Sequence, residues 1–179
     1  HIGHIILANH FAETTDLNEI WMVITPQNPF KKKDSILDNN HRLELVYKAT
    51  MDYPKLKPSN IEFGLPTPNY TIKSLVHLVE KYPEHQFALL MGEDNLVSFP
   101  KWKNYELILG HHEIYVYPRK TNRAIPEQFK NHPKINLIDA PKIELSSSAI
   151  RKAIKKGQNV RPLLPPESWV YLDEMNFYK

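Results

Sequence analysis

The first part of the chain combines a helical pattern with a strand pattern. Residues 1–25 read HIGHIILANHFAETTDLNEIWMVIT. Apolar residues recur at helical spacing over 2–15, and the stretch 17–25 then holds a continuous apolar run whose length suits a buried strand. Because this alternation continues along the chain, the sequence predicts an α/β fold whose parallel strands are covered by helices on both faces.

The rest of the chain repeats the same two patterns. Further helices are expected over 41–53, 71–82, 104–110, 147–156 and 166–176, and further strands over 61–63, 86–91, 113–117 and 135–138. Residues 26–40 are polar, lysine-rich and contain proline, so they are expected to form a long surface loop. Since no repeat or linker divides the sequence, we expect one doubly wound, Rossmann-like domain over 1–179 with a mostly parallel sheet.

The composition excludes several classes of protein. The chain has 179 residues, 41% of them hydrophobic, and therefore suits a globular domain. It has no cysteine, which excludes disulfides and thiolate metal sites, and no apolar run long enough to cross a bilayer. The net charge of +3 suits anionic small molecules and is too small to argue for nucleic acid. We expect a cytoplasmic protein with no membrane or nucleic-acid partner, and a homo-oligomer remains open.

The tetrapeptide His1-Ile2-Gly3-His4 is the first candidate site. Glycine lets the backbone approach an anion closely, and imidazole N–H groups can donate to phosphate oxygens. Because the tetrapeptide opens a helix, free backbone N–H groups add to this attraction. Class I aminoacyl-tRNA synthetases carry the same four letters, but they are much longer and have a Lys-Met-Ser-Lys-Ser motif that this sequence lacks.

The segment Ser146-Ser147-Ser148-Ala149-Ile150-Arg151 is the second candidate site. Its serines supply hydroxyl and N–H groups at a helix start, and Arg151 supplies a forked cation one turn later. An ordinary N-cap explains a serine there equally well. Together the two segments predict a nucleotide phosphate site on which His4 and Arg151 converge.

With Leu145 included, the second segment resembles the Ile-Ser-Ser-Thr-x-Ile-Arg motif of nucleotidyltransferases that carry His-x-Gly-His. Within that superfamily the whole chain resembles the bacterial nicotinate-nucleotide adenylyltransferases. Residues 69–75, Asn-Tyr-Thr-Ile-Lys-Ser-Leu, are similar to the family's Ser-Tyr-Thr-x-Asp-Thr-Leu. Residues 92–94 and 99–102 match its Gly-x-Asp and Phe-x-x-Trp elements, and 26–31 resemble its proline-rich loop. Departures from the family pattern are Leu145, Ser148, Phe30, Lys73 and Asn69.

The resemblance implies transfer of AMP from ATP to nicotinate mononucleotide, with release of pyrophosphate. It implies Mg²⁺ bound with ATP and held mainly by phosphates and water, as is usual for this ion. It also implies a strand and a Gly-[Ser/Thr]-Phe-[Asp/Asn]-Pro loop directly before His1, which the sequence does not contain, so we expect a first strand to be missing from it.

The site residues implied by the resemblance fall into three groups. The catalytic group is His1, His4 and Arg151. The ATP-binding group is Gly3, His4, Ser146, Ser147, Ser148, Arg151, Gly92 and Asp94. The group that binds the mononucleotide is Tyr70, Thr71, Trp102, Lys31 and Arg42. Trp102 would stack on the pyridine ring and Thr71 would lie near its carboxylate. No structural metal is expected, because the remaining histidines lack ligand spacing.

Several alternatives remain open at this stage. Without the resemblance Trp102 is a core residue, Asp94 an ordinary acid at a helix N-terminus, and Lys31 part of a solvated loop. Two sister activities share the same chemistry, namely phosphopantetheine adenylyltransferase and an adenylyltransferase that prefers nicotinamide mononucleotide. A non-catalytic nucleotide-binding module is the alternative from another class.

Overall fold

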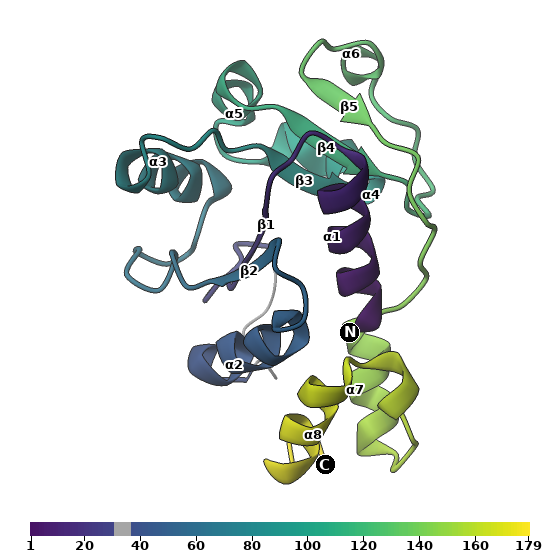
Figure 1. Ribbon diagram of the computed structural model, residues 1–179. Coiled ribbons are helices and arrows are strands. Elements are labelled where there is room, and N and C mark those ends of the chain that lie inside the picture. Colours follow the sequence, from purple (N-terminus) through teal and green to yellow (C-terminus); the bar gives the residue numbers. More distant parts are fainter. Residues whose placement is uncertain (31–36) are drawn as a thin grey trace. The chain divides into compact units, whose positions relative to one another are not determined.

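The structure, a computed structural model, describes residues 1–30 and 37–179. These residues form two compact units, each with its own parallel sheet (Figure 1). The described residues of unit 1 lie within 1–24, 37–60 and 143–179, and those of unit 2 within 25–30 and 61–142. The expectation of one domain over 1–179 remains a prediction.

Unit 1 surrounds a two-stranded sheet. Its elements are α1 (Ile2–Thr14), β1 (Ile20–Val23), α2 (Asn39–Thr50), β2 (Leu56–Ser59), α7 (Ser147–Lys155), the 3₁₀ helix η2 (Arg161–Leu163) and α8 (Pro166–Glu174). β1 and β2 pair in parallel, with Ile20 opposite Leu56. α1 contacts both strands, and α2 packs on β2 and α8. The helices and the strand expected in these parts of the chain are confirmed.

The second strand of unit 1 was not predicted, because its sequence Leu-Lys-Pro-Ser is interrupted by Pro58. Ile20 N–H donates to the Lys55 carbonyl at 2.8 Å and Ile24 N–H to the Ser59 carbonyl at 2.9 Å. Since strand residues alternate in direction, the position of the missing Pro58 N–H faces away from β1. Proline is therefore tolerated in β2 at no cost to the ladder.

The prediction of a strand over 61–63 is wrong. These residues form a turn, in which Leu65 N–H donates to the Glu62 carbonyl at 3.1 Å. The pattern misled because Ile61 and Glu62 are both buried, with 6% of each exposed. Their burial comes from packing and side-chain hydrogen bonds, since Ser74 Oγ donates to Glu62 Oε1 at 2.6 Å.

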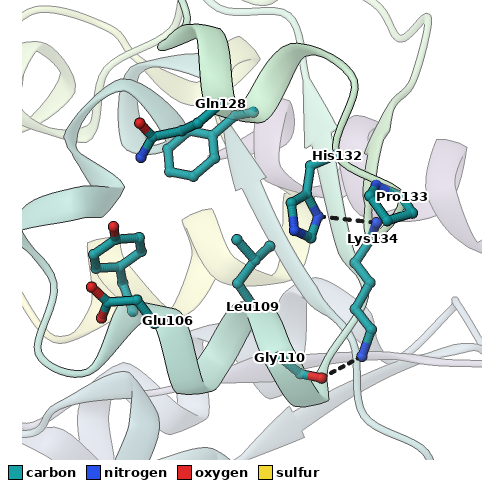
Figure 2. Close-up of a pocket in the computed structure, with 9 residues that line it drawn as sticks. Glu106, Leu109, Gly110, Gln128, His132, Pro133 and Lys134 are labelled. Atoms are coloured by element: carbon teal, nitrogen blue, oxygen red, sulfur yellow. Dashed lines mark hydrogen bonds between the residues drawn. The ribbon is translucent and has the colours of Figure 1, made fainter.

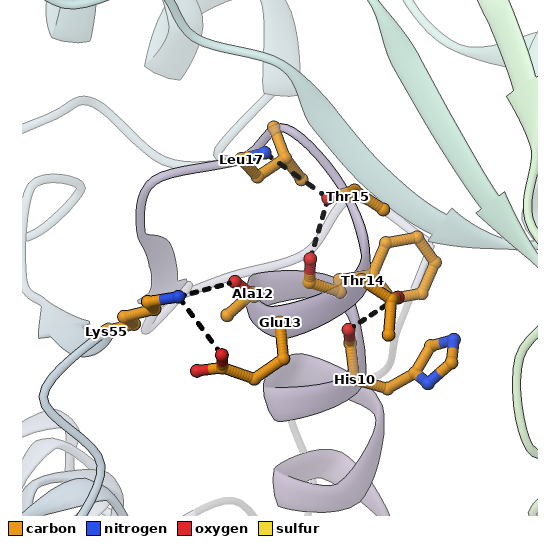
Figure 3. A network of polar contacts seen from close by, with 8 residues as sticks. His10, Ala12, Glu13, Thr14, Thr15, Leu17 and Lys55 are labelled. Atoms are coloured by element: carbon orange, nitrogen blue, oxygen red, sulfur yellow. Dashed lines mark hydrogen bonds and ion pairs between the residues drawn. The ribbon is translucent and has the colours of Figure 1, made fainter.

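Polar contacts fix the C-terminal end of α1 (Figure 3). The Thr14 and Thr15 hydroxyls donate to the carbonyls of His10 and Phe11, each at 2.7 Å. Lys55 Nζ donates to the Ala12 carbonyl at 3.1 Å and lies 3.2 Å from Glu13 Oε2. A cation at this end of a helix satisfies free carbonyls and complements the helix dipole. Lys55 directly precedes β2, so it ties α1 to the sheet of unit 1.

Unit 2 contains a three-stranded parallel sheet in the order β3-β4-β5. Its elements are α3 (Thr71–Lys81), β3 (Leu89–Gly92), α4 (Glu93–Ser98), the 3₁₀ helix η1 (Phe99–Lys101), α5 (Tyr105–His111), β4 (Ile114–Tyr117), α6 (Glu127–Lys130) and β5 (Ile135–Leu137). The central strand β4 buries Ile114 and Val116, and Phe99 and Phe129 complete a fully buried core beside it. Apart from the strand expected over 61–63, the expected helices and strands of this unit are confirmed, although β3 begins three residues later than predicted.

All strand pairings between described residues are parallel, which confirms the mixed α/β fold with helices beside the strands. The short elements α4, η1, α6 and η2 were not predicted, because they are too short to show a hydrophobic period. Among the helices of the described part, none is both long and apolar enough to span a bilayer.

Candidate functional site

The N-terminus of α1 presents two stacked imidazoles. His1 is the N-cap and makes no side-chain capping bond, so the first N–H groups of the helix keep their attraction for an anion. The rings of His1 and His4 stack with centroids 3.8 Å apart and planes 11° apart. His4 is exposed, whereas His1 Nδ1 is buried with no hydrogen-bond partner among the described residues. The stack therefore holds the exposed imidazole at the helix end.

Gly3 allows the start of α1 to approach the segment that leads to α7. A Cβ atom on Gly3 would lie 2.7 Å from Ile143 Cγ2, closer than packed atoms allow, and 3.2 Å from His1 Nδ1, which is a tight contact. Ile143 precedes Ser146, the N-cap of α7, by only a few residues. The N-terminal ends of α1 and α7, far apart in sequence, consequently lie side by side (Figure 1). The convergence of His4 and Arg151 on one polyphosphate stays a prediction.

The serine run caps α7 as the sequence predicts. Ser146 Oγ accepts the Ala149 N–H at 3.4 Å, and Ser147 and Ser148 form the first turn. Arg151 donates from Nη2 to Ser148 Oγ at 3.0 Å. Its guanidinium group is thereby directed toward the N-terminal end of its own helix, where the serine hydroxyls lie.

Tyr178 brings together two arginines that the sequence placed in different roles. The Arg151 guanidinium carbon lies 5.8 Å from the Tyr178 ring centroid. Burial raises the pKa of the Tyr178 hydroxyl, and the charges of Arg151 and Arg42 and the Leu37 backbone N–H oppose this rise. Arg42, in the first turns of α2, therefore lies near the same hydroxyl as Arg151. Sequence reasoning missed Tyr178, because nothing near it in the chain marks it.

In unit 2, Gly92 and Asp94 lie at the carboxyl end of β3, the end of the strands at which ligands bind in parallel sheets. Gly92 ends β3 and pairs with Tyr117, the end of β4. Asp94 Oδ2 lies 3.7 Å from Arg119 Nε, and Asp94 Oδ1 is buried with no hydrogen-bond partner among the described residues. A Cβ on Gly92 would lie 2.6 Å from that same Oδ1. Arg119, missed in the sequence, thus joins the predicted pair.

The three residues predicted to bind the pyridine ring line one cavity of about 60 Å³ in unit 2, namely Tyr70, Thr71 and Trp102. Trp102 is half-buried and packs edge-on against Phe99, so it is both a core contact and a cavity wall. The cavity also has Glu62 and Lys103 in its wall, neither of which was predicted.

Asn69 holds two walls of this cavity together. Its backbone N–H donates to the Gln27 carbonyl at 2.9 Å, and its Oδ1 accepts the Gln27 N–H at 3.0 Å. Its Nδ2 donates to the Glu62 carbonyl at 3.4 Å. The amide that stands where the family has serine therefore makes a reciprocal clamp between the loop at 25–30 and the turn that precedes α3.

The larger cavity of unit 2, about 350 Å³, has a different location (Figure 2). It lies between α5, α6 and the start of β5, and its lining includes the polar residues Glu106, Gln128 and His132. Leu109 and Phe129 are among its apolar lining residues. None of the residues predicted for the site lines it.

Lys31, predicted to bind the mononucleotide, lies outside the described residues. Over the ranges that the structure describes, no three or more His, Asp or Glu side chains gather as a metal site would require. The structure therefore groups the predicted residues as follows. Unit 1 holds His1, Gly3, His4, Arg42, Ser146, Ser147, Ser148 and Arg151, and unit 2 holds Tyr70, Thr71, Gly92, Asp94 and Trp102.

Comparisons with known proteins identify the family of this chain. Residues 1–153 match the family described as cytidylyltransferase-like. A probable nicotinate-nucleotide adenylyltransferase from Flavobacterium psychrophilum is 60% identical over 179 residues, which cover 100% of this chain and 93% of the relative. The chain belongs to the nicotinate-nucleotide adenylyltransferase family. A relative of the same name from Bacteroides thetaiotaomicron is 38% identical over 97% of this chain and 85% of its own length.

A solved structure supports the fold of this family member. The nicotinic acid mononucleotide adenylyltransferase of Plasmodium falciparum, complexed with NaAD, superposes with a TM-score of 0.79 at 20% identity. The match covers 99% of this chain and 90% of that one. At this identity the likeness concerns the fold, and it confirms the Rossmann-like architecture predicted from the sequence.

Proposed function

We propose that this member of the nicotinate-nucleotide adenylyltransferase family transfers AMP from ATP to nicotinate mononucleotide in NAD biosynthesis. A phosphate oxygen of the mononucleotide forms a bond to the α-phosphorus of ATP. The bond from that phosphorus to the oxygen bridging to the β-phosphate breaks, and pyrophosphate leaves with the electron pair. Because the nucleophile is already an anion, no strong protein base is needed, and catalysis depends on positioning and charge stabilisation.

The observation that carries this proposal is the pairing of two helix N-termini in unit 1. α1 brings an uncapped end with the stacked His1 and His4, and α7 brings its serines and Arg151. We assign His4 to the charge that develops at the α-phosphate, since its ring is exposed. Arg151 and the serine end of α7 are assigned to the β- and γ-phosphates that leave as pyrophosphate.

Unit 2 is assigned to the pyridine ring. Tyr70, Thr71 and Trp102 line its small cavity, and the plane of an indole ring suits a flat heteroaromatic ring. We assign Mg²⁺ to the ATP phosphates and water. Asp94 Oδ1, which has no hydrogen-bond partner among the described residues, is assigned as an acceptor for the ribose or for water bound to Mg²⁺. The substrates are nucleotides of the cell interior, which supports a cytoplasmic location.

Pyrophosphate release from ATP tests the proposal. The full-length protein should release pyrophosphate with nicotinate mononucleotide, more slowly with nicotinamide mononucleotide, and not with phosphopantetheine. Trp102→Ala should raise the KM for the mononucleotide about tenfold, the scale of a lost aromatic stack, and leave the KM for ATP nearly unchanged. Trp21→Ala is the matched control, because Trp21 lies in β1 of unit 1 and bonds to Glu19.

Each alternative predicts a different result in the same assay. Release with phosphopantetheine alone would identify that sister activity, and faster release with the amide would identify a nicotinamide-preferring enzyme. Binding of ATP without release under any pairing would favour a nucleotide-binding module. Any of these results would overturn the assignment.

A further inference from the structure

The small cavity of unit 2 has one basic and one acidic group in its wall. Lys103 Nζ lies 4.7 Å from the centroid of the Tyr70 ring, within the range of a cation–π contact. Glu62 is the acidic group, and it is almost fully buried. Both residues therefore share a cavity wall with Tyr70, Thr71 and Trp102, which are assigned above to the pyridine ring.

The two charged groups differ in their partners. Glu62 Oε1 accepts a hydrogen bond from the Ser74 hydroxyl at 2.6 Å, while Oε2 is buried and has no hydrogen-bond partner within the described ranges. Lys103 is exposed, and no carboxylate of residues 1–30 and 37–179 lies within ion-pair distance of it. The Tyr70 ring, rather than an acid, therefore holds the Lys103 ammonium group at the cavity.

The ligand assigned to this cavity is itself charged at two places. In nicotinate mononucleotide the ring nitrogen bonded to ribose carries a positive charge, and the ring substituent is a carboxylate. In the amide counterpart the ring charge is the same and the substituent is neutral. A carboxylate in the wall attracts the ring charge that both compounds share and repels the carboxylate that only the acid carries, so Glu62 cannot favour the acid. An ammonium group can, because only the acid offers it an opposite charge.

We propose that Lys103 is a specificity-determining residue that selects the acid over the amide mononucleotide by pairing with the ring carboxylate. This inference rests on the proposed function, and it adds a charge to the neutral donors that Thr71 and the backbone supply. Tyr70 then has two roles, since it forms part of the cavity wall and positions the Lys103 ammonium group through its ring face.

A salt-dependent preference follows from a charge that remains open to solvent. Ions screen an exposed pair over about 10 Å at 0.1 M salt and over about 3 Å at 1 M. The ratio of kcat/KM for the acid to that for the amide should therefore fall as salt rises. A preference built only from neutral donors and backbone geometry would respond to salt far less.

The test measures pyrophosphate release by the full-length protein with ATP and each mononucleotide. Lys103→Met keeps the aliphatic stem and removes the charge. It should lower kcat/KM for the acid about tenfold, the scale of a lost charge-assisted hydrogen bond, mainly through KM, with less than about a twofold change for the amide. Lys101→Met is the control, since Lys101 is an exposed lysine two residues away that does not line the cavity.

The outcomes separate this inference from the proposed function. An unmodified protein that makes no product with either mononucleotide would overturn the proposed function. An active protein whose Lys103→Met variant keeps both the acid-to-amide ratio and its salt dependence would overturn the role of Lys103 alone. Equal losses for acid and amide would also overturn it, because they would indicate a general effect on the cavity. Lys103→Glu should lower kcat/KM for the acid further than Lys103→Met does.

Discussion

The exposed imidazole of His4 is held in place by chemistry within a single helical turn. His1 stacks on it at 3.8 Å, and Gly3 between them leaves room for Ile143. Under the proposed assignment of His4 to the α-phosphate, a ring held this way would lose little freedom on binding, so its hydrogen bond would be preorganised.

His4→Ala should lower the turnover number by roughly 10²-fold, the scale on which one preorganised donor contributes to catalysis. Steady-state pyrophosphate release at saturating ATP measures it. His10→Ala is the matched control, because His10 lies in the same helix and its ring packs edge-on against Phe11. Turnover within a few-fold of the unmodified protein in His4→Ala would remove His4 from the mechanism.

Residues with local signals could be assigned from the sequence, and residues without them could not. Ser146 as the N-cap and Gly157 with φ of +69° after α7 both follow from ordinary rules for helix ends. Lys103 and Tyr178 belong to no motif, and they contact the distant residues Tyr70 and Arg151, respectively. Their roles depend on partners distant in the sequence.

At the scale of elements, the two ends of α1 have different chemistry. The N-terminal end is left uncapped, while the C-terminal carbonyls are satisfied by threonine hydroxyls and by Lys55. The capped end fixes the helix against β1 and β2, and the uncapped end is the one that we propose to bind phosphate.

Lys55→Met should lower the free energy of unfolding by about 1 kcal/mol, because the last-turn carbonyl of Ala12 and the Glu13 carboxylate lose their cation. Chemical denaturation measures this. Lys57→Met is the control, since its ion pair with Glu19, at 3.9 Å, is exposed and should contribute under about 0.5 kcal/mol. Equal losses in both variants would show that the cap adds nothing beyond an ordinary surface charge.

At the scale of the whole molecule, the chain passes between its two units more than once. Unit 1 takes its elements from both ends of the sequence, while unit 2 is built from 25–30 and 61–142. The phosphate-binding candidates therefore depend on contacts between residues more than 100 positions apart, such as Gly3 with Ile143. We therefore expect a substitution that weakens the packing of α7 and α8 to displace all the phosphate-binding candidates of unit 1 together.

Stability at alkaline pH should report on the packing of α7 and α8. Burial raises the pKa of Tyr178 above its ordinary value of 10.0, so the folded protein binds this proton more tightly than the unfolded chain. The contribution is fully present below pH 10.0 and is lost as the pH rises through the folded-state pKa. Tyr178→Phe should lose less stability above pH 10.0 than the unmodified protein does.

Urea unfolding of both proteins between neutral pH and the alkaline range measures this difference. We expect it to stay under about 1 kcal/mol, because the Tyr178 ring is partly exposed and solvent screens its charges. Tyr82→Phe, in the loop after α3, is the control. Parallel pH profiles for Tyr178→Phe and the unmodified protein would contradict the assignment of a raised pKa.

By itself the sequence determined the α/β class, most helix positions, the caps of α7 and the motifs at two helix starts. These depend on spacing and on neighbours within one or two turns, which the order of residues contains. Only the tertiary structure decided that Pro58 lies in a strand, that Glu62 is buried in a turn, that Lys103 stands over Tyr70 and that Tyr178 lies near two arginines. Each of these results from packing between distant segments, where burial and charge are set by neighbours in space rather than along the chain.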